Sequence, residues 1–207
     1  MLLPKVESPA DVVEVDNLLS YFERKASMEV GSIFIDPGLE TAQSIRQSYE
    51  IATASSRIAH MGGSGGKGGD TSRSIGFQWT PEGLETLYLK SKVLIDVRSA
   101  GVPYPMSGGW FDIHDLEGLR ALAVQLRQLG YTGMHLIHPS HIPVVNEVFS
   151  PTPEDVKHWQ GLVKAMEEMR STGGAAVTFD GDMGDIAHEE TARTMLTVAK
   201  EMGVEGA

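Results

Sequence analysis

Residues 115–138 read DLEGLRALAVQLRQLGYTGMHLIH, and this stretch sets the expectation for the fold. Leucines recur every three or four residues from Leu116 to Leu129, which is the apolar stripe of a helix that packs on a sheet. Gly130 supplies a C-terminal stop for that helix, and the apolar run Met134–His138 follows as a candidate strand. A helix followed at once by a strand is the repeating unit of a parallel α/β fold.

The same alternation continues toward both ends of the chain. Four further β-like runs are Leu2–Val6, Ser32–Ile35, Arg57–Met61 and, more weakly, Val102–Met106. Three helix-start signals place a hydroxyl residue before a proline: Ser8-Pro9, Thr80-Pro81 and Thr152-Pro153. Two more helices, over Pro153–Ser171 and about Ile186–Met202, follow no strand of this type. A closed barrel needs eight strands, so either the sheet is smaller and open or barrel strands precede Met1, and the abrupt start favours the second.

The bulk composition excludes several classes of protein. The chain has 207 residues, a net charge of −11 and no cysteine. The acidic balance argues against nucleic acid and anionic membranes as partners, and the lack of cysteine excludes disulfides and thiolate metal sites. We find no apolar run long enough to span a membrane and no signal peptide. From these features we expect a cytoplasmic protein.

Two acidic residues follow candidate strands. Glu40, in Asp36-Pro37-Gly38-Leu39-Glu40, comes after one strand, and Asp70 closes the glycine-rich segment 62–70 after the next. Carboxylates without histidine or cysteine partners suit a hard cation that keeps waters, so we expect Mg²⁺, with Mn²⁺ as the alternative, between Glu40 and Asp70. For Glu40 the structural alternative is an acid in the first turn of a helix.

The glycine-rich segment does not match a phosphate-binding P-loop. Lys67 is followed by Gly68 where Ser or Thr is required, and the first glycine of the motif falls on Met61. A flexible linker is the other alternative, but the βα pattern resumes directly after the segment. We therefore favour the interpretation that the glycine-rich segment serves to place the Asp70 carboxylate.

The histidines of His135-Leu136-Ile137-His138-Pro139-Ser140-His141 do not form a zinc motif. His135 and His138 point to opposite faces of a strand, and His141 lies beyond Pro139. We expect His138, at the strand end, to face a ligand, and His135 to be a packed or hydrogen-bonded residue.

The segment Ile137–Pro151 reads IHPSHIPVVNEVFSP. Three earlier features precede it in the chain: Leu3-Pro4-Lys5-Val6-Glu7-Ser8, Leu39-Glu40-Thr41-Ala42 and Asp70. In these features and in their order the chain resembles the citrate lyase β-subunit-like branch of the HpcH/HpaI aldolase superfamily, and Ile137–Pro151 is the most specific of them. The resemblance extends from Leu2 to about Met202. It implies an α/β fold, a (β/α)8 TIM barrel of which residues 1–150 carry about the last five βα units (strands 4 to 8). Residues 151–207 would then form a C-terminal helical extension that packs on the barrel or on a neighbouring subunit.

The resemblance also implies an activity. It implies a Mg²⁺-dependent carbon–carbon lyase that cleaves or forms a 3-hydroxyacyl-CoA thioester, of malyl or citramalyl type, to give a 2-oxo acid and an acyl-CoA. Glu40 and Asp70 would hold the metal, and Asp185 would be a catalytic acid/base contributed across the interface of a homo-oligomer, often a trimer. Lys5, Trp110 and His138 are candidates for substrate binding. A helix cap is the structural alternative for Asp185.

Three departures from the family pattern bear on these expectations. The first three strands are missing, and with them a substrate-binding arginine and an acidic cluster near the metal. The glycine-rich segment is longer than the usual Gly-x-x-Asp turn, and the chain reads Tyr104–Trp110 where relatives carry an aspartate. A thioesterase or synthase that uses the same enolate chemistry, or a truncated non-catalytic fragment, therefore remains open.

Overall fold

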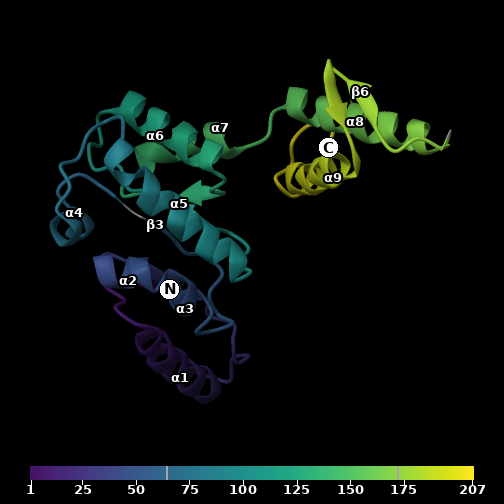
Figure 1. The fold of residues 1–207 in the computed structure, drawn as a ribbon. Coiled ribbons are helices and arrows are strands. Elements are labelled where there is room, and N and C mark those ends of the chain that lie inside the picture. Colours follow the sequence, from purple (N-terminus) through teal and green to yellow (C-terminus); the bar gives the residue numbers. More distant parts are fainter. Residues whose placement is uncertain (64, 172) are drawn as a thin grey trace. The chain divides into compact units, whose positions relative to one another are not determined.

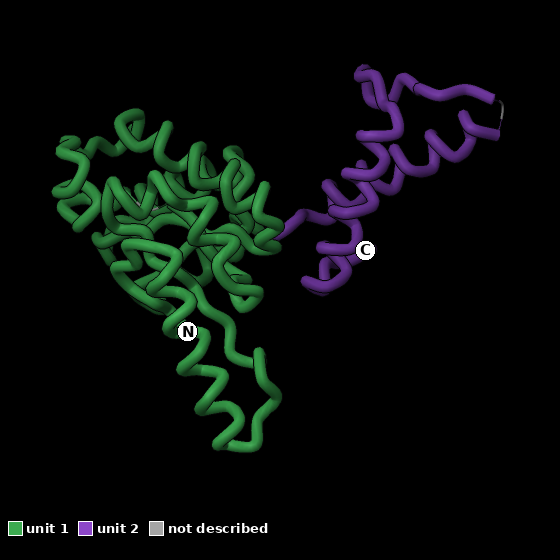
Figure 2. The backbone as a smooth tube through the Cα atoms, turned by 60° about the horizontal axis from the view of Figure 1, so that its bottom comes forward, with its two compact units in different colours: residues 1–149 green, residues 150–207 purple. Residues whose placement is uncertain are grey.

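The chain forms two compact units in the computed structural model, Met1–Phe149 and Ser150–Ala207 (Figure 2). The structure describes residues 1–63, 65–171 and 173–207. Ser64, inside the glycine-rich segment, lies outside the described residues.

Parallel strands run through the first unit in the order of the chain. They are β1 (Leu2–Leu3), β2 (Asp36–Leu39), β3 (Gly62–Gly63), β4 (Met106–Ser107) and β5 (Gly133–Met134). β1 pairs with β2, β2 with β3 and β4 with β5, each in parallel. A parallel bridge between His60 and Tyr104 continues the arrangement from the β3 segment to the β4 segment.

Helices separate these strands, as a βα pattern requires (Figure 1). In chain order they are α1 (Pro9–Lys25), α2 (Ala42–Arg46), α3 (Ser48–Ala52), α4 (Asp70–Ile75), α5 (Leu84–Ser99), α6 (Leu116–Leu129), the 3-10 helix η1 (Pro139–His141) and α7 (Ile142–Phe149). The leucine stripe from Leu116 to Leu129 forms the buried face of α6, where Leu119, Ala123 and Leu126 are fully covered.

The strands were expected in the right order, and their positions are confirmed to different degrees. β1 lies inside the expected run Leu2–Val6, β4 and β5 overlap their expected runs at Met106 and Met134, and β2 and β3 begin just after theirs. Ile35 only bridges to Ile58, and the paired residues of β2 begin at Asp36. In the same way, the expected strand Arg57–Met61 leads into β3 at Gly62. In β2 and β3 the apolar residues Ile35 and Met61 come just before the ladder, and most of the paired residues are Asp36, Pro37 and glycines, which carry little β signal.

One expected helix start is wrong. Ser8 caps α1 and Pro153 begins α8 (Pro153–Ser171), but Thr80-Pro81 does not begin a helix, because α5 starts at Leu84. Gly83 has a φ of +67°, a left-handed conformation that cannot continue a helix from Pro81. Thr80 instead donates its amide to Glu85 Oε1 at 2.8 Å.

A buried ionic cluster ties α1 to the sheet. Arg57, 3% exposed, donates to Glu23 Oε2 at 2.6 Å and to Asp16 Oδ1 at 2.5 Å. Glu23 also accepts the amides of Gly31 and Ile33. The Arg57 hydrogen bonds hold the pKa of Glu23 at about 2, so this carboxylate stays charged although it is covered.

The second unit contains α8, an antiparallel hairpin and α9 (Ile186–Glu201). The hairpin strands are β6 (Val177–Phe179) and β7 (Asp182–Gly184), joined by Asp180 and Gly181, which both have positive φ. Asp-Gly is a strong signal for a two-residue hairpin turn, and the sequence analysis missed it. Leu162, Met166 and Ala192 form the core of this unit. Among the described residues, no helix combines the length and the apolar character needed to cross a membrane.

Candidate active site

Glu40 lies between β2 and α2, outside the helix. Thr41 is the N-cap residue of α2, and the first turn of α2 contains no acidic residue. The alternative that Glu40 only serves a helix dipole therefore does not hold. Its Oε1 atom accepts the backbone amide of Lys5 at 3.2 Å, which connects the end of β2 to the end of β1.

Asp70 is the first residue of α4, so the helix dipole favours its negative charge. Lys5 Nζ lies 3.2 Å from Asp70 Oδ2, and Arg73 pairs with the other carboxylate oxygen. Hydrogen bonding to Lys5, and then to Glu40, lowers the pKa of Asp70 below its usual value of 3.8. Glu40, Asp70 and Lys5 thus meet in one cluster, although they lie in three separate segments of the sequence.

This cluster opens into a cavity of about 390 Å³ at the carboxyl ends of the strands. Every strand segment contributes to its wall, through Leu2, Leu39, Gly62, Ser107 and His135. The carboxyl ends of the strands are where α/β barrels carry their polar sites.

A histidine–aspartate pair that the sequence analysis missed lies at the same site. His135 lines the cavity, and its Nε2 lies 2.6 Å from Asp36 Oδ2. Asp36 Oδ1 is buried and has no partner among the described residues. The two residues are 99 positions apart, so no local pattern could have paired them.

The carboxylate pair fits a hard divalent cation. Among the described residues no group of three or more metal-binding side chains comes together, so Glu40 and Asp70 stand as a pair. Two carboxylates and several open positions suit Mg²⁺, which usually keeps waters and takes further oxygens from the substrate.

Other expected site residues lie elsewhere. His138 caps η1, where its Nδ1 accepts the amide of Ser140 at 3.2 Å. Trp110 lines a second cavity, beside Trp79. Neither residue lines the cavity of Glu40 and Asp70.

Asp185 belongs to the second unit and caps α9. Its Oδ1 accepts the amides of Ala187 and His188, at 3.0 and 3.2 Å. His188 Nδ1 lies 2.7 Å from the same atom, and this hydrogen bond is the largest cause that lowers the pKa of Asp185. The capping role is therefore present, and a catalytic role stays a prediction.

Parallel strands in chain order, with helices between them and an acid pair at their carboxyl ends, define a segment of a (β/α)8-type barrel. Residues 1–139 match the family model described as HpcH/HpaI aldolase/citrate lyase. The chain belongs to this family.

Individual relatives agree with this assignment. The chain is 29% identical over 198 residues to the citrate lyase subunit beta of Haemophilus influenzae, with 96% of the chain and 67% of the relative covered. It is 30% identical over 217 residues to the L-malyl-CoA/beta-methylmalyl-CoA lyase of Cereibacter sphaeroides, with 97% and 67% covered. The chain thus spans about two thirds of these relatives.

A solved structure confirms the fold. CitE of Mycobacterium tuberculosis, in complex with magnesium, acetoacetate and coenzyme A, superposes with a TM-score of 0.72 and 25% identity, over 96% of this chain and 67% of that one. The expected citrate lyase β-subunit-like branch, and a fold that represents part of a barrel with additional helices, are confirmed.

Proposed function

We propose that this protein is a Mg²⁺-dependent carbon–carbon lyase that acts on 3-hydroxyacyl-CoA thioesters of malyl or citramalyl type. It would release, or in reverse condense, a 2-oxo acid and an acyl-CoA. The observation that carries the proposal is the Glu40–Asp70 pair in the cavity at the strand ends. The names of the relatives, citrate lyase and malyl-CoA lyase, support the reaction type.

Glu40 and Asp70 would hold the metal ion. When bound, Mg²⁺ supplies a Lewis acid for the hydroxyl and carboxylate oxygens of the substrate. The ammonium of Lys5, beside Asp70, would then be released to attract the substrate carboxylate. Mn²⁺ would serve as a substitute because it has the same preference for oxygen ligands.

Bond cleavage leaves an enolate of the thioester, and this enolate must take up a proton. We propose Asp185 as the acid/base residue, supplied across the subunit interface of a homo-oligomer, which the family resemblance implies to be a trimer. Because His188 lowers the pKa of Asp185, the group is a carboxylate at neutral pH. In the direction of bond formation this carboxylate would remove the α-proton of the acyl thioester. In the direction of cleavage it would take the proton of the substrate hydroxyl and return a proton to the enolate carbon, so that no net proton is gained or lost.

The remaining expectations stay proposals. We propose that Trp110 and His138 contact the substrate outside the cavity of Glu40 and Asp70, whose wall includes neither residue. We also propose that the protein works in the cytoplasm on small molecules. We propose that cavity residues such as Phe111 and His135 contribute to the choice of oxo acid and acyl chain.

The experiment measures cleavage of malyl-CoA and citramalyl-CoA with Mg²⁺, assaying both products. A lyase yields a 2-oxo acid and an acyl-CoA, whereas a thioesterase yields free CoA and a hydroxy acid. Asp70→Asn and Glu40→Gln should each reduce turnover by about 100-fold or more, since each removes one of two charged ligands. Glu50→Gln, an exposed acid on α3, is the matched control. Unchanged turnover in Asp70→Asn would overturn the metal assignment.

A further inference from the structure

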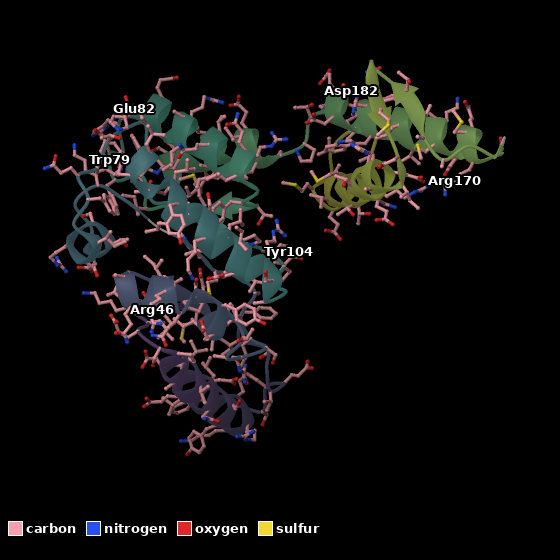
Figure 3. The ribbon with its side chains drawn as sticks, in the orientation of Figure 1. Arg46, Trp79, Glu82, Tyr104, Arg170 and Asp182 are labelled. Carbon is pink, nitrogen blue, oxygen red and sulfur yellow. The ribbon has the colours of Figure 1, made fainter. Side chains whose placement is uncertain are left out.

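A second cavity, of about 250 Å³, lies between the glycine-rich segment, the start of α5 and α6. We call it the tryptophan pocket and define it by Trp79, Trp110, Phe111 and Lys90; Figure 3 marks Trp79, on the segment that leads into α5. We propose that the tryptophan pocket binds a flat organic anion, an aromatic carboxylate, with its ring against the tryptophans and its carboxylate on Lys90.

The aromatic wall of the tryptophan pocket is built by close contact with glycine backbone. A Cβ atom on Gly118 would lie 2.2 Å from Trp110 Cζ2, and one on Gly66 would lie 2.3 Å from Phe111 Cε2. Both rings are therefore seated directly on the main chain. The rings of Trp79 and Trp110 lie 5.7 Å apart at 60° and form one aromatic wall, and Lys67 Nζ lies over the Trp79 ring, 5.6 Å from its centroid.

Lys90 supplies a buried positive charge. It is 4% exposed, and its Nζ donates to Gln125 Oε1 at 3.3 Å, a neutral partner. Burial lowers the pKa of Lys90, and Glu85 offsets this only in part. The Glu85 carboxylate is itself bound to the amide and hydroxyl of Thr80, at 2.8 and 2.9 Å.

The acids of the pocket wall do not neutralise Lys90. Asp115 Oδ1 accepts the amide of Gly118 at 2.9 Å, and Asp112 Oδ1 accepts the amide of His114 at 3.0 Å. Among the interactions of the described residues, Lys90 takes part in no ion pair within 4.0 Å. A buried ammonium without a counter-ion is costly, so an anionic ligand is the natural complement to this charge.

The size of the pocket restricts the ligand further. Its volume is below the roughly 300–1,000 Å³ of sites for drug-sized molecules, which favours a compound with a single ring. Trp110 Nε1 is buried and has no partner among the described residues, so its N–H is a hydrogen-bond donor that these residues leave unsatisfied. Gly66, Gly108 and Phe111 line both cavities, so such a ligand would lie beside the Glu40–Asp70 site.

The test is a titration of the whole chain with benzoate, in which calorimetry and tryptophan fluorescence measure binding. EDTA is present so that no metal contributes. Benzyl alcohol tests the ring without the charge, and acetate tests the charge without the ring. We expect saturable benzoate binding at about millimolar concentration, and both comparison probes should bind at least about tenfold more weakly. Because no substrate or metal is present, the outcome is independent of lyase activity.

Variants locate the binding. Lys90→Met keeps the length of the side chain and removes the charge, and Trp79→Leu removes one ring; each should weaken benzoate binding by about tenfold or more. Lys92→Met, on the same helix but paired with Asp96, is the matched control and should leave binding unchanged. Circular dichroism checks that each variant is folded. The proposal is overturned if benzoate does not bind the parent chain, or if folded Lys90→Met binds it equally well.

Discussion

If Glu40 and Asp70 hold a metal ion as proposed, Lys5 competes with that ion for Asp70, and replacing Lys5 should strengthen metal binding. Its Nζ lies 3.2 Å from Asp70 Oδ2, and an incoming cation must displace this contact. The Lys5 side chain is 67% exposed and that of Asp70 is 28% exposed, so solvent screens most of their attraction. Pairs of this kind are weak, and we expect Lys5→Met to tighten Mg²⁺ binding by about 1.5- to fivefold.

Methionine is the appropriate replacement at this position. Lys5 has a φ of +54°, and any residue with a Cβ carries the same backbone strain there, so Lys5→Met changes the charge without relieving the strain. The backbone amide of Lys5, which donates to Glu40 Oε1, is retained. Lys25→Met, an exposed lysine in the last turn of α1, is the control for a lost positive charge.

The assay is a Mn²⁺ titration followed by electron paramagnetic resonance, with Mg²⁺ as competitor. High salt should reduce the difference between Lys5→Met and the parent chain, because the competing ion pair is then screened. Affinity that falls in Lys5→Met would refute the reasoning: it would mean that Lys5 holds Asp70 in place for the metal and does not compete with it.

Three further predictions concern stability. Because Arg57 holds the pKa of Glu23 at about 2, below its usual 4.5, the contribution of this pair is complete above pH 4.5 and is lost as the pH falls toward 2. Urea unfolding at several pH values should show this loss, and Glu23→Gln should flatten it. Leu126→Ala, in the fully buried face of α6, should lower the free energy of unfolding by about 2–5 kcal/mol. Exposed Leu84→Ala is its control. Gly62→Ala should destabilise by about 1–3 kcal/mol or more, because its Cβ would lie 1.6 Å from Met106 O; a variant as stable as the parent would contradict the close approach of β3 and β4.

The fold was predictable because its helices carry strong periodic signals. The leucine stripe of α6 and the start of α8 at Pro153 follow from side-chain spacing and capping, which act locally. The positions of β2 and β3 were displaced because very short parallel strands are defined by backbone pairing between distant segments. In β3 the paired residues are Gly62 and Gly63, which have no side chains to signal a strand.

The site was predictable only in part, for a similar reason. Glu40 and Asp70 could be found because Glu40 directly follows β2 and Asp70 ends the loop that follows β3, and parallel strands bring their carboxyl ends to one edge. Their contact with Lys5 depends on a turn after β1 that carries no acid or histidine. The Asp36–His135 pair joins the first residue of β2 to the residue that follows β5, and the 99 positions between them leave no local pattern that could predict the contact.

The role of the glycine-rich segment could not be predicted from its composition. Its glycines suggest either a phosphate loop or a flexible linker, yet several of them are required by close packing. A Cβ on Gly62 would meet Met106 O, one on Gly65 would meet Thr86 Cγ2 at 2.7 Å, and one on Gly66 would meet Phe111. Each contact fixes a different boundary: Gly62 joins neighbouring strands, Gly65 lies against α5, and Gly66 lies on the wall shared by the two cavities. These glycines therefore bring backbone into close contact with its neighbours, and Asp70 follows them as the first residue of α4, where Lys5 and Arg73 contact its carboxylate.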